Sequence, residues 1–297
     1  MVYGITGNTS KAELWEPVAR LVAWLDAEAL AFRLHAPVAE GLRARGLVEE
    51  RLCTAHGTEA LAAEADVVLS FGGDGTLLRS AHEVGHTGTP LLGINIGRLG
   101  FLADVEIGDV QETIRQLERG DYHLDHRLVL SAEVDSTPPR RFWALNEIVI
   151  ERGGAVGMIA IDVAVDGVPL NRYWADGLII ATPTGSTAYS LAAGGPIVAP
   201  GADVLLLSPL APHTLTVRPF VLPASSVLEA RVVSRRQPYV LAADGLSTEP
   251  MEEHVGITIR RAPHTVNLVK LPQQHYFKTL RTKLTWGGGN RREKGAG

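Results

Sequence analysis

Apolar positions over about the first 120 residues follow two alternating patterns. Short apolar runs of strand length stand at residues 2–6, 30–34, 66–71 and 91–96. Helical spacing of apolar side chains follows the first run, at Leu14, Val18, Leu21, Val22 and Leu25, and recurs over residues 107–119. Strands that alternate with helices favour a parallel sheet covered by helices. We therefore predict a Rossmann-like α/β domain over residues 1–124.

From about residue 122 the pattern changes to a period of two. Residues 128–134 and 159–165 alternate in this way, and Asp166-Gly167 supplies a turn after the second run. Further short apolar runs stand at residues 204–207, 226–233 and 255–259. These runs predict a β-rich domain over residues 125–271.

The C-terminal part, residues 272–297, has a different character. Residues 275–286 are amphipathic and predict a helix, which we expect to return to the first domain. The glycine-rich and basic tail from residue 287 is expected to be disordered.

Composition narrows the class of protein. The chain has 297 residues, a formal net charge of −5 and a pI near 6.1, which give no sign of a nucleic-acid or membrane partner. Its one cysteine, Cys53, excludes an intramolecular disulfide and is expected to be a buried structural thiol. No apolar run reaches the roughly 18 residues of a membrane span, and residues 1–6 lack the features of a signal peptide. We therefore expect a cytoplasmic protein.

The most informative motif is Gly72-Gly73-Asp74-Gly75-Thr76, which joins the apolar run 66–71 to a helix predicted over residues 76–83. We expect its glycines to take positive φ and to let a ligand approach closely, while the N–H groups at the helix start favour an anion. A phosphate site with a built-in carboxylate is the interpretation that we favour. The alternative is a tight turn in which Asp74 only caps the helix.

Two better-known phosphate motifs are absent from the sequence. A P-loop requires Gly-Lys-Ser or Gly-Lys-Thr, and the chain contains neither. The dinucleotide fingerprint requires a third glycine where Leu78 stands. The motif around Asp74 is therefore of a different kind.

Residues 176–190 form a second candidate site. An apolar run is followed there by a dense series of hydroxyl and glycine residues that includes Tyr189. A short helix start would present free N–H groups, and an aromatic ring could stack on a base. The alternative is a polar turn capped by Ser and Thr.

A third candidate is Asn146-Glu147, two polar residues that interrupt the apolar run 145–150. An amide can pair with an adenine edge, and a carboxylate can accept hydrogen bonds from ribose hydroxyls. The alternative is a strand end that faces solvent.

Residues 82–86, His-Glu-Val-Gly-His, match the zinc-protease pattern H-E-x-x-H. That chemistry requires both histidines on one face of a continuous helix. Gly85 and the turn residues 87–90 predict instead that the helix stops here. We interpret His82 and His86 as polar residues at a helix end.

Four segments together resemble the NAD kinase family: Gly72 to Thr76, residues 95–101, Asn146-Glu147 and residues 176–190. The resemblance runs from about residue 65 to residue 223 and includes Pro212-His213-Thr214-Leu215 and Arg218-Pro219. Phosphofructokinases and diacylglycerol-type lipid kinases resemble the chain only at the first segment. The resemblance implies Mg²⁺-dependent phosphoryl transfer from ATP or polyphosphate to the 2′-hydroxyl of the adenosine ribose of NAD, giving NADP. It also implies a homo-oligomer, a dimer or tetramer.

By this resemblance Asp74 is the base that removes the 2′-hydroxyl proton. The expected substrate and nucleotide contacts are Gly73, Gly75, Thr76, Arg79, Asn95, Phe101, Asn146, Glu147, Trp174, Asp176, Thr187, Ala188, Tyr189, Ser190, Ala192 and Leu246. No protein metal ligand is expected, because Mg²⁺ would arrive with the donor phosphates. Arg79 and Arg98 are the nearest cations.

The chain departs from the family pattern at Gly157, Trp174, Ala192 and Leu246, where members often have basic or other polar residues. Arg172 could replace one lost cation. A lipid or sugar-phosphate kinase and a dinucleotide-binding regulator without catalysis are the alternatives. The carboxylate at position 74 and the polar loops of the second half favour an NAD kinase.

Overall fold

The structure is a computed structural model that describes all residues except 98, 155–156, 234–237, 253–254 and 287–297. The chain divides into two compact units. The first unit is Met1–Asp125 with Asn267–Gly297, and the second unit is His126–Val266. The tail expected to be disordered lies outside the described residues.

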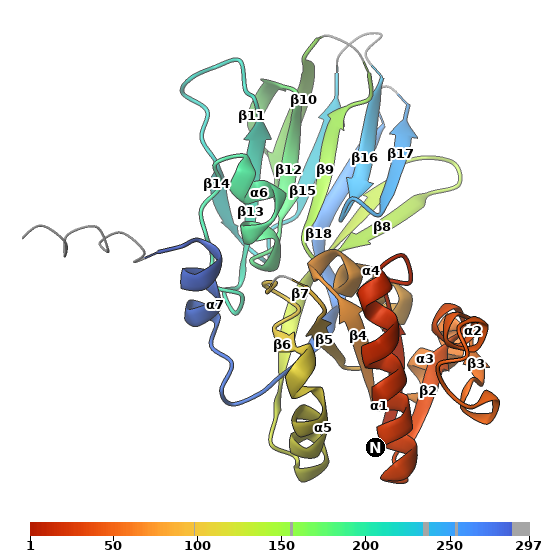
Figure 1. The fold of residues 1–297 in the computed structure, drawn as a ribbon. Helices are drawn as coiled ribbons and strands as arrows, with labels where there is room; N and C mark the ends of the chain where they lie inside the picture. The colour runs from red at the N-terminus through yellow and green to blue at the C-terminus, as the bar shows by residue number, and fades with distance from the viewer. Residues whose placement is uncertain (98, 155–156, 234–237, 253–254, 287–297) are drawn as a thin grey trace, which may run out of the picture. The chain divides into compact units, whose positions relative to one another are not determined.

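The first unit is an α/β fold, as predicted (Figure 1). Its strands are β1 (Val2–Gly7), β2 (Ala31–His35), β3 (Ala55–His56), β4 (Val67–Gly72), β5 (Leu91–Asn95) and β6 (Val105–Glu106). Its α-helices are α1 (Trp15–Ala27), α2 (Ala36–Ala44), α3 (Thr58–Glu64), α4 (Asp74–Val84), α5 (Val110–Arg119) and α7 (Tyr276–Lys283). Its 3₁₀ turns are η1 (Ala12–Leu14), η2 (Glu50–Leu52), η3 (Gly85–Thr87) and η4 (Ile107–Asp109).

The sheet of the first unit is parallel. Its strand order is β5-β4-β1-β2-β3, with β6 beside β5, and Leu268 near the end of β18 (Gly256–Lys270) pairs with Leu91. Alternate residues of β1 point to the same face of the sheet. Tyr3 and Ile5 are fully buried there, against a core that includes α1 and α5. The predicted return of the C-terminal helix to the first domain is confirmed, because the described residues 267–286, which include α7, belong to the first unit.

The second unit is β-rich, also as predicted. Its other strands are β7 (His123–Val134), β8 (Arg140–Ala144), β9 (Glu147–Arg152), β10 (Ile159–Val165), β11 (Val168–Ala175), β12 (Gly177–Ala181), β13 (Val204–Leu210), β14 (Phe220–Pro223), β15 (Leu228–Val232), β16 (Tyr239–Ala243) and β17 (Ser247–Met251). It also contains η5 (Thr184–Thr187) and α6 (Tyr189–Ala192). The predicted turn at Asp166-Gly167 is present, and both residues have positive φ.

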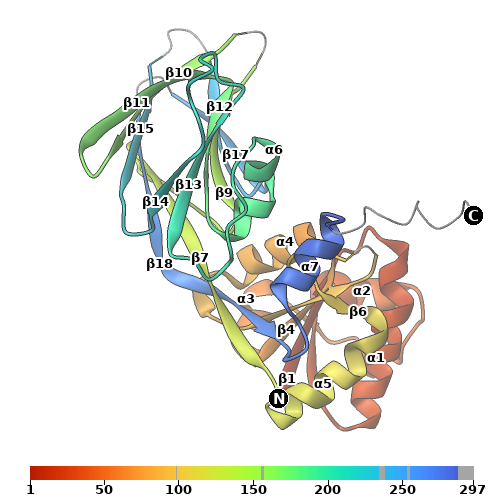
Figure 2. The same cartoon turned by 90° about the vertical axis from the view of Figure 1, so that its left-hand side faces the viewer.

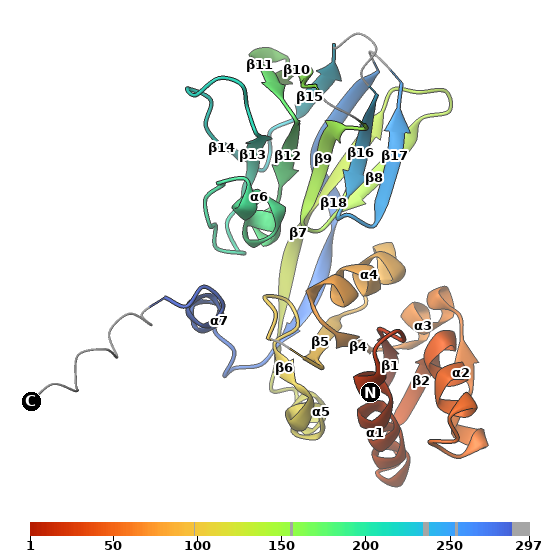
Figure 3. The same cartoon turned by 45° about the horizontal axis from the view of Figure 1, so that its top comes forward.

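Two sheets pack face to face in the second unit. One has the order β14-β13-β12-β9-β16-β17, which can be followed across Figure 3. The other contains β11, β10, β15 and β18, and Figure 2 shows β10, β11 and β15 as a layer separate from β12, β13 and β9. Period-two alternation directs one side chain in two inward, so that Ile150, Ile161 and Leu178 share one core.

The predicted end of the helix after Asp74 agrees with the structure, whereas two short helices were not predicted. α4 ends at Val84, and Gly85 follows with a φ of 59°, so the helix stops where the sequence predicts and no continuous helix carries both His82 and His86. Helices α2 and α3 were not predicted. They have 9 and 7 residues, too few for a clear periodic pattern.

Candidate active site

The first candidate site lies at the carboxyl edge of the parallel sheet in the first unit. Gly72 at the end of β4 is the register partner of Asn95 at the end of β5. The loops that follow these neighbouring strands therefore start side by side, and they carry the predicted residues from Gly73 to Arg79 and from Asn95 to Phe101. Ligands of open parallel sheets bind at this edge.

The glycine-rich turn differs from the expectation in its backbone conformation. Gly73 is the N-cap of α4 and is extended, with φ −108° and ψ −168°, and none of the three glycines has positive φ. The expectation of positive φ was wrong because the strand leads directly into the helix through an extended N-cap residue, the usual conformation there. A Cβ at Gly73 or Gly75 would meet none of the described atoms within 4 Å. The fold itself thus leaves open space beside both glycines.

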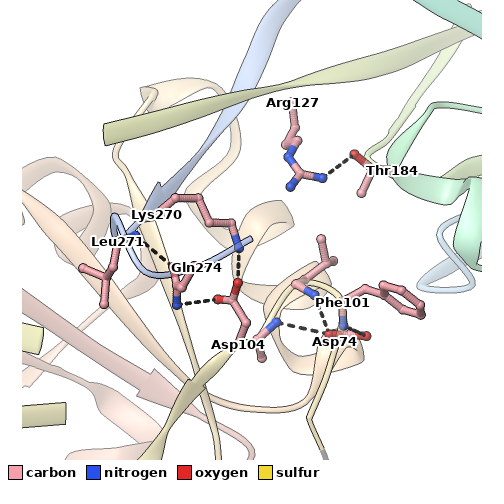
Figure 4. Close-up of polar contacts among 10 residues, drawn as sticks. Asp74, Phe101, Asp104, Arg127, Thr184, Lys270, Leu271 and Gln274 are labelled. Carbon is pink, nitrogen blue, oxygen red and sulfur yellow. Dashed lines mark hydrogen bonds and ion pairs between the residues drawn. The ribbon is translucent and has the colours of Figure 1, made fainter. Parts of the chain in front are cut away.

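Asp74 is the first residue of α4, and its side chain turns toward the loop that follows β5 (Figure 4). Its Oδ2 accepts a hydrogen bond from the N–H of Phe101 at 2.9 Å, and its Oδ1 accepts from Leu102 at 2.9 Å and Ala103 at 3.2 Å. The carboxylate therefore fastens a second loop instead of capping its own helix, for which no side-chain cap is found. The capping alternative is not what the structure shows.

Those three bonds determine what Asp74 can still do. An ionised carboxylate offers about four acceptor positions. Among the described residues three of them are used, two on Oδ1 and one on Oδ2. One position on Oδ2 is therefore left to accept a proton or to contact a cation, and the carboxylate is fixed in place while it does so.

Gly100 makes this arrangement possible. A Cβ at this position would lie 2.0 Å from Oδ1 of Asp74 and 2.8 Å from its Cγ. Only a residue without a side chain lets the loop come so close to the carboxylate. The N–H of Gly100 also donates to the carbonyl of Ala103 at 3.1 Å, which closes the turn around Asp74.

The other predicted residues of the first unit have varied surroundings. Asn95 is buried, and its Oδ1 accepts from the N–H of Gly97 at 2.8 Å, so it shapes its own loop. Thr76 lies in the first turn of α4, whereas Arg79 is exposed. Phe101 is partly buried, and Nζ of Lys283 lies 5.4 Å from its ring centre. Arg98 lies outside the described residues.

The candidate residues Asn146 and Glu147 lie in the second unit, at the start of β9. Asp244 holds this point in the manner of Asp74: its Oδ2 accepts from the N–H of Leu145 at 2.8 Å. Its Oδ1 accepts from Asn146 at 2.8 Å and from Glu147 at 3.1 Å. Asp244 has a φ of 52°, and the turn with Gly245 brings its carboxylate back onto β9. Asn146-Glu147 is therefore a fixed feature of the fold and both residues are buried, so the solvent-facing alternative does not hold.

Glu147 is a buried acid without full hydrogen bonding. Its side chain is 7% exposed, and Oε2 has no hydrogen-bond partner among the described residues. Burial, and then the charge of Asp244, raises the pKa of Glu147 to about 8, while a hydrogen bond from the N–H of Tyr189 lowers it. Glu147 is therefore largely protonated at neutral pH and can donate a hydrogen bond as well as accept one.

The hydroxyl-rich segment packs directly against Asn146. The N–H of Thr182 donates to the carbonyl of Asn146 at 2.8 Å, and Thr182 Oγ1 donates to the carbonyl of Leu145 at 2.6 Å. A Cβ at Gly185 would lie 2.2 Å from the oxygen of Asn146. Asn146-Glu147 and the hydroxyl-rich segment of residues 176–190 are therefore in direct contact. Arg127, which is buried, donates to Thr184 Oγ1 at 3.2 Å on the same segment (Figure 4).

Asp176 and Tyr189 line one pocket of the second unit, of about 410 Å³. Arg152 also lines it, and its Nε lies 3.2 Å from Oδ1 of Asp176. Tyr189 is 43% exposed, so its ring is accessible for stacking. Burial, and then the carboxylates of Glu151, Asp176 and Glu147, raise the pKa of the tyrosine.

The remaining predicted residues of the second unit differ in exposure. Ser190 is fully buried, and its Oγ shares a hydrogen bond of 2.9 Å with Ser208, so its hydroxyl is used within the fold. Thr187 and Ala188 are partly exposed. The residues open to solvent are Trp174, Ala192 and Leu246.

Arg172 is paired with an acidic residue. Its Nε and Nη2 bind both carboxylate oxygens of Asp162, at 2.5 and 2.8 Å, across the β10–β11 pair. That Arg172 replaces a lost cation therefore stays a prediction, and its guanidinium already has an acidic partner on the neighbouring strand. The two residues face each other in the register of an antiparallel hairpin.

Three residues that build the sites were given no role of their own by the sequence: Gly100, Arg127 and Asp244. Gly100 lies within the segment 95–101 that carries the family resemblance, and Asp244 lies in Asp244-Gly245, directly before Leu246. An Asp-Gly pair between two apolar runs signals a turn, but its spacing gives no hint of the strand that the carboxylate holds. Nothing in the local sequence distinguishes Arg127 from a surface arginine.

An α/β unit with a fixed carboxylate at a glycine-rich helix start, together with a β-rich unit that carries polar pockets, is typical of a kinase for a nucleotide substrate. Two family models match the chain: the ATP-NAD kinase N-terminal domain over residues 4–122 and the ATP-NAD kinase C-terminal domain over residues 145–271. The chain therefore belongs to the NAD kinase family.

Individual relatives of the chain lead to the same family. The NAD kinase of Bacteroides fragilis (strain ATCC 25285) is 46% identical over 229 residues, which are 77% of this chain and 79% of that protein. The NAD kinase of Chloroherpeton thalassium is 38% identical over 288 residues, 97% of this chain and 98% of that protein. Among solved structures, yeast NADH kinase complexed with NADH has a TM-score of 0.90 at 25% identity, covering 99% of this chain and 90% of that one.

No described helix is long and apolar enough to cross a membrane. Cys53 is fully buried, as predicted, and is a free thiol.

Proposed function

We propose that this chain transfers the terminal phosphoryl group of ATP to the 2′-hydroxyl of the adenosine ribose of NAD, with Asp74 as the base. The observation that carries the proposal is the fixed carboxylate of Asp74, which keeps one acceptor position on Oδ2. A base held by three N–H groups loses no freedom when the substrate binds, so its orientation is already determined before reaction. Phosphoryl transfer depends mainly on such positioning and on charge neutralisation.

The glycine-rich turn supports a phosphate beside Asp74. Because an added Cβ at Gly73 or Gly75 would meet open space, the fold alone does not explain why glycine stands there. A phosphate that contacts the backbone closely would explain it, and the N-terminus of the eleven-residue helix α4 favours the negative charge. Thr76, Arg79, Asn95 and Phe101 are the further contacts that we propose on this side.

The adenosine half of NAD is proposed to bind residues of the second unit. Asn146 and the protonated Glu147 would fix donor and acceptor edges, and the exposed ring of Tyr189 would stack on a base. Asp176 lines the same pocket as Tyr189 and could accept from a hydroxyl. We propose Trp174, Thr187, Ala188, Ser190, Ala192 and Leu246 as peripheral contacts, with Ser190 acting through its backbone because its hydroxyl is already bonded to Ser208.

We further propose Mg²⁺ as the divalent cation. Within the described residues no group of three or more His, Cys, Asp and Glu side chains is arranged to hold a metal ion. Mg²⁺ commonly binds through one or two carboxylates and the phosphates of its substrate. Because the one remaining acceptor position of Asp74 is assigned to the ribose proton, we propose that the ion is carried by the donor phosphates and not by a protein carboxylate. Bound in that way, the ion would neutralise charge on the donor phosphates.

A homo-oligomer in the cytoplasm, a dimer or tetramer, completes the proposal. In support, β11 lies at the edge of its sheet and exposes three large apolar side chains, Val168, Leu170 and Trp174. An exposed apolar edge strand is a common place for association of chains. Light scattering of the purified protein measures the oligomeric state directly, and a monomer would contradict this part.

The activity is tested by incubating purified protein with NAD, Mg²⁺ and either ATP or polyphosphate, and measuring NADP with an NADP-specific dehydrogenase. We expect NADP with ATP, and the polyphosphate arm determines whether that donor is used as well. Omission of Mg²⁺ with added EDTA is the matched control and should abolish the signal. Absence of NADP with both donors would contradict the proposal and favour a dinucleotide-binding regulator.

A further inference from the structure

Lys270 and Asp104 form a buried ion pair in the first unit that the proposed function does not use. Nζ of Lys270 lies 2.7 Å from Oδ2 of Asp104, and each side chain is only 11% exposed. Nε2 of Gln274 donates to the other oxygen, Oδ1, at 3.1 Å. Oε1 of Gln274 in turn accepts from the N–H of Leu271 at 2.8 Å, which fixes the amide (Figure 4).

The two ends of this cluster come from distant parts of the sequence. Lys270 and Gln274 belong to the C-terminal segment, residues 267–286, which re-enters the first unit at Leu268. Asp104 belongs to the loop of residues 100–104 that follows β5. A buried charge pair is costly unless its geometry is good and its remaining positions are bonded, and here both carboxylate oxygens are bonded. Pairs of this kind fix one arrangement of the chain.

The position of Asp104 connects the cluster to the candidate base. Asp104 directly follows Phe101, Leu102 and Ala103, whose N–H groups hold Asp74. The 100–104 loop is therefore fastened on one side to Asp74 and on the other to the C-terminal segment. The same segment touches the loop a second time, because Nζ of Lys283 lies 5.4 Å from the centre of the Phe101 ring.

We infer that Lys270, with Asp104 and Gln274, forms a positioning cluster that holds the 100–104 loop, and through it the carboxylate of Asp74, in the orientation needed for proton abstraction. None of the three is a catalytic residue, since they act through the loop. The inference rests on the proposed role of Asp74. It predicts that the C-terminal segment, remote in sequence from every catalytic motif, controls turnover more than substrate affinity.

The test compares variants of the full chain by kcat and KM, measured well below each variant's melting temperature. Lys270→Met removes the charge at similar length, and we expect kcat to fall about 10- to 100-fold, because displacement of a positioned group by about 1 Å can cost this much. KM for NAD and for ATP should change less than about threefold, since no proposed binding group is removed. Lys270→Arg keeps the charge and donors and should recover most of the loss. Gln274→Ala, a milder change, should lower kcat in the same direction.

A double variant separates positioning from a general loss of stability. If Lys270 acts through Asp74, then Lys270→Met added to Asp74→Asn should lower kcat no further, whereas independent effects would multiply. Tyr3→Phe is the matched structural control. It removes the hydrogen bond of 2.6 Å that the Tyr3 hydroxyl donates to Glu118 in the same unit. Tyr3 lies near the N-terminal end of β1, whereas the Asp74 loop lies at the carboxyl edge of the sheet, so this variant should lower the melting temperature while kcat is retained.

The outcomes distinguish this inference from the proposed function. A slow Asp74→Asn variant together with a normal kcat for Lys270→Met would overturn the positioning role alone. Multiplicative losses in the double variant, or equal losses for Tyr3→Phe and Lys270→Met, would also overturn it. Normal turnover by Asp74→Asn would instead refute the proposed base, whatever Lys270→Met does.

Discussion

Replacement of Gly100 by alanine tests how closely the 100–104 loop must approach Asp74. The new Cβ would lie 2.0 Å from Oδ1 of the carboxylate, whereas ordinary contact begins near 3.4 Å. The carboxylate or the loop must therefore move by about 1.4 Å, the difference between these distances. A misplacement of about 1 Å can cost about 10²-fold in rate, so we expect kcat to fall by about 10²-fold or more.

The same change should also destabilise the fold. Forcing an extra methyl group into a packed position typically costs about 1–3 kcal/mol. The three hydrogen bonds to Asp74 are involved as well, and a bond to a charged group contributes about 1.5–3 kcal/mol. Thermal unfolding should therefore show a clear decrease in melting temperature for Gly100→Ala.

The assay measures initial rates of NADP formation at saturating NAD and ATP, at a temperature where the variant stays folded. Gly108→Ala is the matched control, because its added Cβ meets no described atom within 4 Å and its φ is not positive. It should keep normal turnover. A Gly100→Ala variant with kcat within about threefold of the parent would refute the reasoning that this loop positions Asp74.

Two further predictions concern the second unit. Glu147 should make stability depend on pH: between about 4.5 and 8 the unfolded chain loses this proton and the folded chain keeps it, so the free energy of unfolding falls as pH rises, by at most about 1.4 kcal/mol per pH unit. Urea unfolding at several pH values should show this slope, and Glu147→Gln should flatten it; an unchanged slope would contradict the raised pKa. Asp244→Asn replaces one acceptor oxygen by a donor amide opposite N–H groups of residues 145–147, and should lower the free energy of unfolding by about 1–3 kcal/mol. It should also lower the pKa of Glu147, and an unchanged urea midpoint would contradict the holding role of Asp244.

The fold class could be predicted from the sequence because both units follow strong local patterns. Four apolar runs became β1, β2, β4 and β5 nearly at their predicted bounds, and period-two runs became β7 and β10. In each case the order of apolar and polar residues along the strand shows whether one face or the whole strand is buried. The short helices α2 and α3 lack this signal, since seven to nine residues contain only about 2 to 2.5 turns.

The candidate site was predicted less completely, and for a physical reason. The motif around Asp74 is local, but its three hydrogen-bond donors follow it by 27 to 29 residues. Asp244 follows its partners by 97 to 99 residues, and Lys270 is 166 residues from Asp104. Spacing along the chain does not encode such pairs, which depend on where the strands place them. The sequence therefore indicates which carboxylate matters better than it indicates what holds that carboxylate.

The most direct test of the account is the turnover of Asp74→Asn. An amide can keep the two bonds at Oδ1, but it presents a donor to the N–H of Phe101 and is no base at neutral pH. A positioned base contributes about 10²- to 10⁴-fold, so kcat for NADP formation should fall by that range, while KM for NAD and ATP stays within a few-fold. Near-normal kcat in a correctly folded variant would contradict the claim that Asp74 removes the proton from the ribose hydroxyl.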